Sequence, residues 1–129
     1  MARILIVEDD LDLIETYTDL LTMHGHEVRS AIRLGEALKA LEEVPPQIIM
    51  LDLQLPGARA ATLAEFAQTA KRVSGAAIII VSGHPEMMSS AGLLDAVDLV
   101  LVKPVHNPDL LSFVDRMITM QPAPAVHQG

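Results

Sequence analysis

Five short apolar segments recur along the chain, and longer segments with apolar residues at helical spacing separate them. The apolar segments are Arg3–Val7, Glu27–Ser30, Ile48–Leu51, Ala77–Val81 and Leu99–Val102. Four of them are continuous and rich in aliphatic residues, which is typical of parallel strands covered on both faces. The second segment is mostly polar, which predicts an edge strand with one side in water.

The intervening segments predict helices. Apolar residues repeat at helical spacing over residues 13–21, 34–41, 60–70 and 110–118, and a weaker pattern over residues 85–94 is interrupted by Gly92. Gly25 and Pro45 mark helix ends, and Asn107-Pro108 predicts an N-cap followed by the first helical residue. The alternation predicts one α/β domain over residues 1–120, a doubly wound (βα)5 three-layer sandwich with a five-stranded parallel sheet. Residues 121–129 are predicted to be a flexible C-terminal tail.

The amino-acid composition and net charge of the chain exclude several classes of function. Half of the 129 residues are hydrophobic but only three are aromatic, so the core must be aliphatic. The chain has 17 acidic and 9 basic residues, a net charge of −8, which argues against direct nucleic-acid binding. It has no cysteine, which excludes disulfides and thiolate metal sites and fits a reducing cytosol. The first apolar run is too short for a signal peptide or a membrane span, so we expect a cytoplasmic protein without a membrane contact.

Chemically useful side chains follow four of the five predicted strands. Glu8-Asp9-Asp10 follows the first, Asp52 the third, Ser82 the fourth and Lys103-Pro104 the fifth. Ligands of open parallel sheets bind beyond the carboxyl ends of the strands. We therefore expect these side chains to meet in one crevice.

Three carboxylates in one crevice repel one another unless a cation offsets their charge. All-oxygen ligands without Cys or His favour Mg²⁺, with Mn²⁺ as an alternative, and such an ion accepts phosphate oxygens. A carboxylate can accept a phosphoryl group as an aspartyl phosphate, with Lys103 and the metal facing its oxygens. Taken singly, Lys103 could be a solvated lysine and Ser82 a turn residue, and Asp10 is expected to cap a helix rather than bind metal.

Together these stretches resemble the receiver domain of bacterial response regulators, the partners of histidine kinases in two-component signalling. The resemblance covers about residues 2–119, and it rests on Ile-Leu-Ile-Val-Glu-Asp-Asp (4–10), Ile-Ile-Met-Leu-Asp-Leu-Gln-Leu-Pro-Gly (48–57), Ile-Ile-Ile-Val-Ser-Gly (78–83) and Leu-Val-Lys-Pro (101–104). It implies the flavodoxin-like strand order 2-1-3-4-5, which agrees with a polar edge strand at the second position.

The resemblance also implies a role for each matching residue. Asp52 is expected to be the phosphoacceptor, Ser82 the switch hydroxyl and Lys103 the phosphate contact. The metal ligands are expected to be Glu8, Asp9 and Asp52 with the backbone carbonyl of Gln54, Asp9 being a direct ligand. A cis Lys103–Pro104 bond is implied as well.

The chain departs from the family pattern at one switch position. Val100 stands in the fifth strand, three residues before the lysine, where the family usually places an aromatic ring. The usual inward movement of that ring is therefore not available here. Gln54 and His84 occupy two variable positions that tune phosphate lifetime in the family, and we predict that His84 affects the attacking water or its access. The other four histidines, His24, His26, His106 and His127, are expected to be surface or local packing residues.

We expect a signalling switch that assists only its own phosphorylation and is not an enzyme with a separate substrate. Three other functions fit the sequence less well. A phosphohydrolase of the haloacid dehalogenase type needs an acid where this chain has Gln54. A nucleotide or flavin binder lacks the glycine-rich phosphate motifs. A degenerate receiver would not need to retain all five site residues.

The expected partners are a histidine kinase or phosphotransfer protein and a downstream protein target. No output domain follows within the chain, so we expect docking to another protein or derivation from a longer regulator. Because the fifth strand is an apolar edge, we also predict that the surface of the fourth helix, fifth strand and fifth helix forms a homodimer or pairs with a partner.

Overall fold

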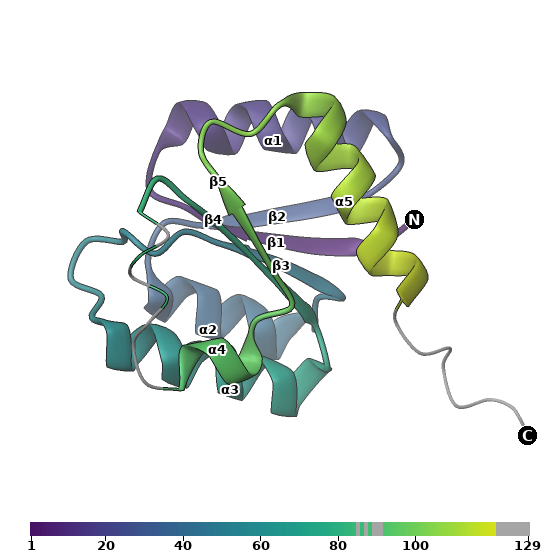
Figure 1. The fold of residues 1–129 in the computed structure, drawn as a ribbon. Helices are drawn as coiled ribbons and strands as arrows, with labels where there is room; N and C mark the ends of the chain where they lie inside the picture. Colours follow the sequence, from purple (N-terminus) through teal and green to yellow (C-terminus); the bar gives the residue numbers. More distant parts are fainter. Residues whose placement is uncertain (85, 87, 89–91, 121–129) are drawn as a thin grey trace, which may run out of the picture.

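The computed structural model, which describes residues 1–84, 86, 88 and 92–120, has a central parallel sheet of five strands in the order β2-β1-β3-β4-β5. The strands are β1 (Arg3–Val7), β2 (Glu27–Ala31), β3 (Ile48–Leu51), β4 (Ala77–Ser82) and β5 (Leu99–Val102). The predicted α/β class and strand order are confirmed, and β2 is the edge strand predicted from its polar residues (Figure 1). Two predicted strands are each one residue longer than expected, at Ala31 and Ser82.

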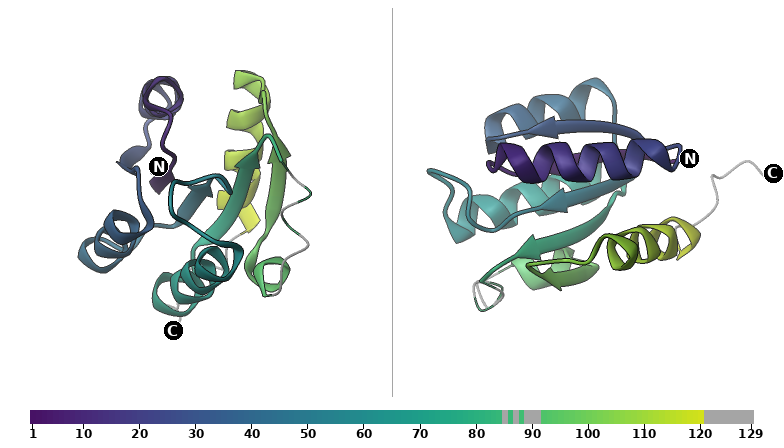
Figure 2. Two further views of the ribbon diagram at one scale, coloured as in Figure 1. Left: turned by 90° about the vertical axis from the view of Figure 1, so that its left-hand side faces the viewer. Right: turned by 90° about the horizontal axis from the view of Figure 1, so that it is seen from above.

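Helices cover both faces of the sheet. The first face carries α1 (Leu11–Met23) and α5 (Asn107–Met120), and the second carries α2 (Leu34–Glu43), α3 (Ala60–Ser74) and α4 (Leu93–Ala96), as two further views show (Figures 1 and 2). Alternate residues of each buried strand therefore enter different cores. In β1, Leu5 and Val7 pack toward α2 and α3, whereas Ile4 and Ile6 pack toward α1 and α5. This two-sided burial explains why the central strands are uninterrupted aliphatic runs.

Local signals fix the helix ends. The Asp10 carboxylate accepts hydrogen bonds from the backbone N–H groups of Asp12 and Leu13, so it caps α1 as predicted. Gly25 follows this helix with a φ of 86°, a left-handed conformation that glycine adopts without steric cost. The last helix begins at the predicted cap, Asn107, one residue earlier than the predicted first helical residue, Pro108.

The prediction for the fourth helix is only partly met. Helix α4 covers Leu93–Ala96, at and beyond the end of the predicted range 85–94. Gly92 has a φ of 83°, which no right-handed helix contains, and it precedes the helix instead of lying inside it. Residues 85, 87 and 89–91 of the predicted range, like the predicted tail over 121–129, lie outside the described residues. Within the described part of the chain, every helix is too short or too polar to cross a bilayer.

Candidate phosphoacceptor and metal site

The carboxyl ends of β1 and β3 bring three acidic side chains together. Glu8, Asp9 and Asp52 each offer a carboxylate oxygen, and these oxygens all lie within 4.8 Å of one another. The cause is parallel pairing, because β1 and β3 are neighbours and Val7 lies beside Leu51. The backbone continues this pairing, since Asp52 donates its N–H to the carbonyl of Val7. The cluster predicted from strand ends is therefore present.

Burial differs among the three acids. Glu8 and Asp52 are buried, with 2% and 5% of their surface exposed, whereas Asp9 is exposed to solvent. Two buried carboxylates in the same site are costly without a compensating cation or hydrogen bonds. Asp52 Oδ1 accepts a bond from the N–H of Gln54 at 3.3 Å, and Glu8 Oε2 accepts one from Asp10 at 3.1 Å.

Lys103 supplies the positive charge of the site from the end of β5. Its Nζ donates to Glu8 Oε1 at 2.7 Å and lies 3.7 Å from Asp52 Oδ2. The lysine thus bonds Glu8 directly and faces Asp52 through a longer ionic contact. The bond between Lys103 and Pro104 is cis, as the sequence resemblance implied.

The pKa values of Glu8 and Lys103 reflect this arrangement. Burial raises the pKa of Glu8 above its ordinary value, although the hydrogen bond from Lys103 opposes the change. For Lys103, burial alone would lower the pKa, but the hydrogen bond to Glu8 and the charge of Asp52 outweigh it and raise the pKa. The lysine is therefore firmly protonated at neutral pH and partly neutralises the acidic cluster.

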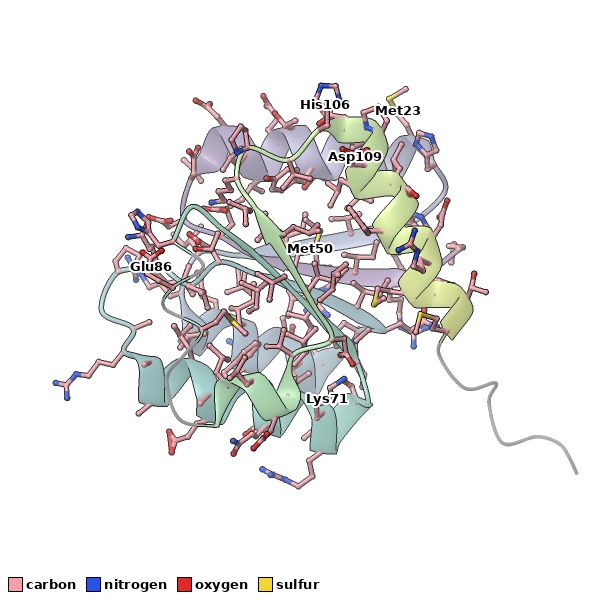
Figure 3. All side chains as sticks on the ribbon, viewed as in Figure 1. Met23, Met50, Lys71, Glu86, His106 and Asp109 are labelled. Carbon is pink, nitrogen blue, oxygen red and sulfur yellow. The ribbon has the colours of Figure 1, made fainter. Side chains whose placement is uncertain are left out.

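Ser82 and His84 lie at the end of β4. Ser82 is fully buried, and its Oγ accepts a hydrogen bond from the backbone N–H of His84 at 3.0 Å. The pairing of β4 and β5 holds the end of β4 beside Lys103, because Lys103 donates its backbone N–H to the Ser82 carbonyl. The exposed ring of His84 instead contacts Glu86, with Nδ1 3.1 Å from Oε2, and Figure 3 shows Glu86 beyond the carboxyl ends of the strands.

The structure adds one residue that sequence reasoning placed only in a helical stripe. Tyr17 of α1 is buried at 4% exposure in the core between the sheet and α5. Burial raises the pKa of its phenol, and the charges of Lys103, Glu8 and Asp52 act on it as well. Periodicity correctly predicted that this residue faces the sheet, but nothing in the sequence indicated its closeness to the acidic cluster.

Val100 lies in β5, three residues before Lys103 and beside Ile80 of β4. Its side chain remains 37% exposed, so the position that lacks an aromatic ring is a partly open surface position.

A family model described as the response regulator receiver domain matches residues 4–115. The chain is 26% identical to the protein PilH of Pseudomonas aeruginosa, over 92% of this chain and 98% of that protein. It is 35% identical to the transcriptional regulatory protein AfsQ1 of Streptomyces coelicolor, over 83% of this chain but only 47% of that protein's length.

Solved structures agree with this similarity. The response regulator TrrA of Thermotoga maritima, solved in complex with Mg²⁺ and BeF, has 27% identity and a TM-score of 0.77, with 91% of this chain and 99% of that chain covered. A CheY-like receiver domain protein of Methanospirillum hungatei has 28% identity and a TM-score of 0.81, with 94% and 99% covered.

Proposed function

The chain belongs to the response regulator receiver domain family, and on that premise we propose that it is a phosphorylation-dependent switch with Asp52 as its phosphoacceptor. The observation that carries this proposal is the position of Asp52. Its buried carboxylate lies within 4.8 Å of two other acids and 3.7 Å from the Lys103 ammonium. A nucleophilic carboxylate, an acidic cluster and a cation are the components that phosphoryl transfer to aspartate requires.

The metal ion of the proposed site is Mg²⁺, which Mn²⁺ could replace because both prefer oxygen ligands. The donor set fits, since Glu8, Asp9 and Asp52 offer oxygens close together and the family resemblance adds the carbonyl of Gln54. Asp9 is the best direct ligand, because Glu8 already bonds Lys103. Bound there, the ion would neutralise negative charge on the transferred phosphoryl oxygens. The Mg²⁺ and BeF complex of TrrA supports this assignment.

The proposed reaction moves one phosphoryl group from a donor phosphohistidine to Asp52. A carboxylate oxygen of Asp52 attacks phosphorus, the bond from phosphorus to the donor imidazole nitrogen breaks, and its electron pair remains on that nitrogen. The Lys103 ammonium then pairs with a phosphoryl oxygen, exchanging part of its contact with Glu8. Ser82 Oγ, which accepts from His84 N–H in this structure, keeps its own proton to donate to the phosphoryl group.

The proposed partners are a histidine kinase or phosphotransfer protein as donor and a downstream protein as reader. The surface of α4, β5 and α5 is proposed as a contact with a partner or a second copy. It exposes Leu94, Val100 and Val102 at 61%, 37% and 54%. Valine at position 100 offers no ring to reorient, so a signal that crosses this surface does not use an aromatic rotation at that position.

We propose that His84 sets the lifetime of the phosphorylated state. Its backbone N–H bonds the buried Ser82 hydroxyl, and its ring is oriented by Glu86 at the solvent side of the same strand end. His84→Ala should change the rate of phosphate loss without changing uptake. An unchanged rate of loss would show that the ring has no part in water access or attack.

Intact-mass measurement tests the proposed function. We expect incubation with Mg²⁺ and acetyl phosphate to add one phosphoryl mass to the native chain. Asp52→Asn should add none, because an amide is not a nucleophile of this kind. Excess EDTA should suppress the gain in the native chain. Equal phosphorylation of the native chain and Asp52→Asn would refute Asp52 as the acceptor.

A further inference from the structure

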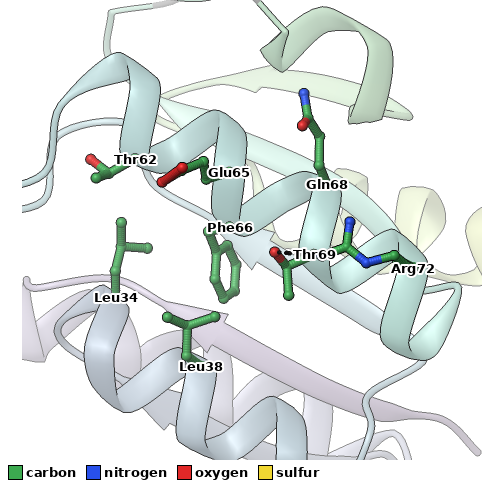
Figure 4. Close-up of a pocket in the computed structure, with 8 residues that line it drawn as sticks. All are labelled: Leu34, Leu38, Thr62, Glu65, Phe66, Gln68, Thr69 and Arg72. Atoms are coloured by element: carbon green, nitrogen blue, oxygen red, sulfur yellow. Dashed lines mark hydrogen bonds between the residues drawn. The ribbon is translucent and has the colours of Figure 1, made fainter.

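A groove lies between α2 and α3, on the second face of the molecule. It has a volume of about 440 Å³ and is lined by Leu34, Leu38, Thr62, Glu65, Phe66, Gln68, Thr69 and Arg72. Figure 4 shows the two leucines of α2 facing Phe66 of α3 across the groove. A smaller hollow of about 240 Å³ continues it past Leu34 and Thr62 to the segment that carries Pro56 and Gly57.

The groove has an apolar interior that is open to solvent. Phe66 is buried, Leu34 is half-buried, and Leu38 leaves 40% of its surface exposed at the rim. A hydrophobic groove of this kind can accept the apolar face of an amphipathic helix. The α3 residues that line it span Thr62 to Arg72, which at 1.5 Å per residue is about 15 Å, or about three turns of a bound helix.

Positive charge marks both ends of the groove. Arg33 lines the smaller hollow and Arg72 lines the far end, and both side chains are exposed. Neither arginine has a carboxylate within 4.0 Å among the residues that the structure describes. By contrast, Arg29 is paired with Glu43. The Arg72 guanidinium is held by a hydrogen bond to Thr69 Oγ1 at 3.4 Å. Although the chain has a net charge of −8, these two arginines without a carboxylate partner make the ends of the groove positively charged.

We propose that this groove binds an acidic amphipathic helical segment of a partner protein. The apolar face of the segment would cover Leu34, Leu38 and Phe66, and carboxylates at its two ends would pair with Arg33 and Arg72. Arginine prefers carboxylates in planar, bidentate geometry, which gives both orientation and specificity. Glu65 on the α3 rim adds selectivity, because it would repel a carboxylate placed at the middle of the segment. The groove shares no residue with the acidic cluster.

A direct binding assay on the unmodified chain tests this proposal. The probe is a fluorescein-labelled synthetic helical peptide with leucines along one face and glutamates at both ends. One control peptide carries lysines in place of the glutamates, and a second carries serines in place of the leucines. We expect fluorescence anisotropy to show saturable binding of the acidic peptide, with both control peptides at least about tenfold weaker.

Matched variants locate the binding surface. Leu38→Glu and Arg72→Glu should each weaken the acidic peptide at least about tenfold. Val73→Glu is the control for Leu38, since Val73 is 49% exposed on α3 but does not line the groove. Arg116→Glu on α5 is the control for the charge reversal. Neither control should change binding, and circular dichroism would verify that all four variants are folded.

Four results would overturn the proposal. The first is no saturable binding of the acidic peptide at millimolar concentration. The second is equal binding of the lysine peptide, and the third is equal weakening by Val73→Glu. The fourth is a dimer in sedimentation that Leu38→Glu dissociates, which would assign the groove to a second copy of the chain.

Discussion

Lys103 should be the most important lysine for stability, and the three lysines of the chain form a matched test. Lys103 bonds the buried Glu8, Lys71 pairs with the partly exposed Asp98, and Lys39 is exposed. Replacing each by methionine keeps most of the aliphatic stem and removes the ammonium group, with its charge and its hydrogen-bond donors. The contrast among the three variants therefore isolates the value of the charge inside the acidic cluster.

The expected magnitude follows from burial. Removing one partner of a fully buried ion pair costs about 3–5 kcal/mol, because the other charge is left uncompensated. The side chains of Glu8 and Asp52 are 3% and 6% exposed, but that of Lys103 keeps 22%. We therefore expect Lys103→Met to lower the free energy of unfolding by about 2–3 kcal/mol. Lys71→Met should cost about 0–1 kcal/mol as a partly exposed pair, and Lys39→Met less than about 0.5 kcal/mol.

Urea unfolding in EDTA at pH 7.5 measures these differences, and two further dependences check the cause. Burial already raises the pKa of Glu8, and losing Lys103 removes a group that lowers it. The folded variant therefore binds a proton at higher pH than the unfolded chain does. The loss of unfolding free energy in Lys103→Met, relative to the native chain, should be full above the folded pKa of Glu8. This loss should shrink as the pH falls through that value.

Added Mg²⁺ should stabilise Lys103→Met more than the native chain, because the ion and the ammonium neutralise the same carboxylates. A deficit no larger than that of Lys39→Met, or one that neither acid nor Mg²⁺ reduces, would refute the view that Lys103 compensates this cluster.

Two further predictions concern the buried His26 and the N-terminal cap of α1. His26 is buried, its Nδ1 accepts from the N–H of Ala2, and burial lowers its pKa. The pKa of His26 is therefore higher in the unfolded chain, at about 6.5, than in the folded chain. Its contribution to the free energy of unfolding is full above about pH 6.5 and is lost as the pH falls through the folded pKa. The urea midpoint of His26→Gln should vary less between pH 7.5 and 5.5 than that of the native chain or of the exposed control His24→Gln. Equal pH dependence in all three proteins would exclude His26 as the cause of the variation. Asp10→Ala should destabilise the chain by about 1 kcal/mol through loss of the α1 cap, and Asp12→Ala, which removes no cap, should cost less in the same assay; equal costs would contradict the capping role.

The fold could be predicted closely because the pattern of residues within each segment indicates whether that segment is a strand or a helix. Short uninterrupted aliphatic runs favour strands, and β1, β3 and β5 have the bounds that the runs predicted. The expectation of cover on both faces is wrong for β5, an edge strand that leaves Val100 and Val102 exposed. Helix α4 could not be predicted as well, because its start depends on a tertiary contact. Gln68 of α3 donates a hydrogen bond to the carbonyl of Gly92, and the left-handed φ of that glycine places the helix after it.

The proximity of the side chains at the strand ends could be predicted from the sequence, but their individual contacts could not. Parallel topology alone brings the side chains after β1, β3, β4 and β5 to one edge. Which carboxylate Lys103 bonds depends on side-chain rotamers, and the structure selects Glu8 at 2.7 Å over Asp52 at 3.7 Å. The groove had no sequence signal, because Leu34 and Leu38 look like ordinary core residues of α2 until the spacing of α2 and α3 is known.

Mn²⁺ titration followed by two-dimensional NMR tests most directly whether the strand ends form one cation site. Mn²⁺ takes the oxygen ligands that Mg²⁺ takes, and it broadens the amide signals of nearby residues. We expect sub-stoichiometric Mn²⁺ to broaden residues 8–10 and 52–54 first, with the effect reversed by excess Mg²⁺ and much reduced in Asp9→Asn. Broadening that begins elsewhere on this acidic surface, or that persists unchanged in Asp9→Asn, would contradict a metal site beside Asp52.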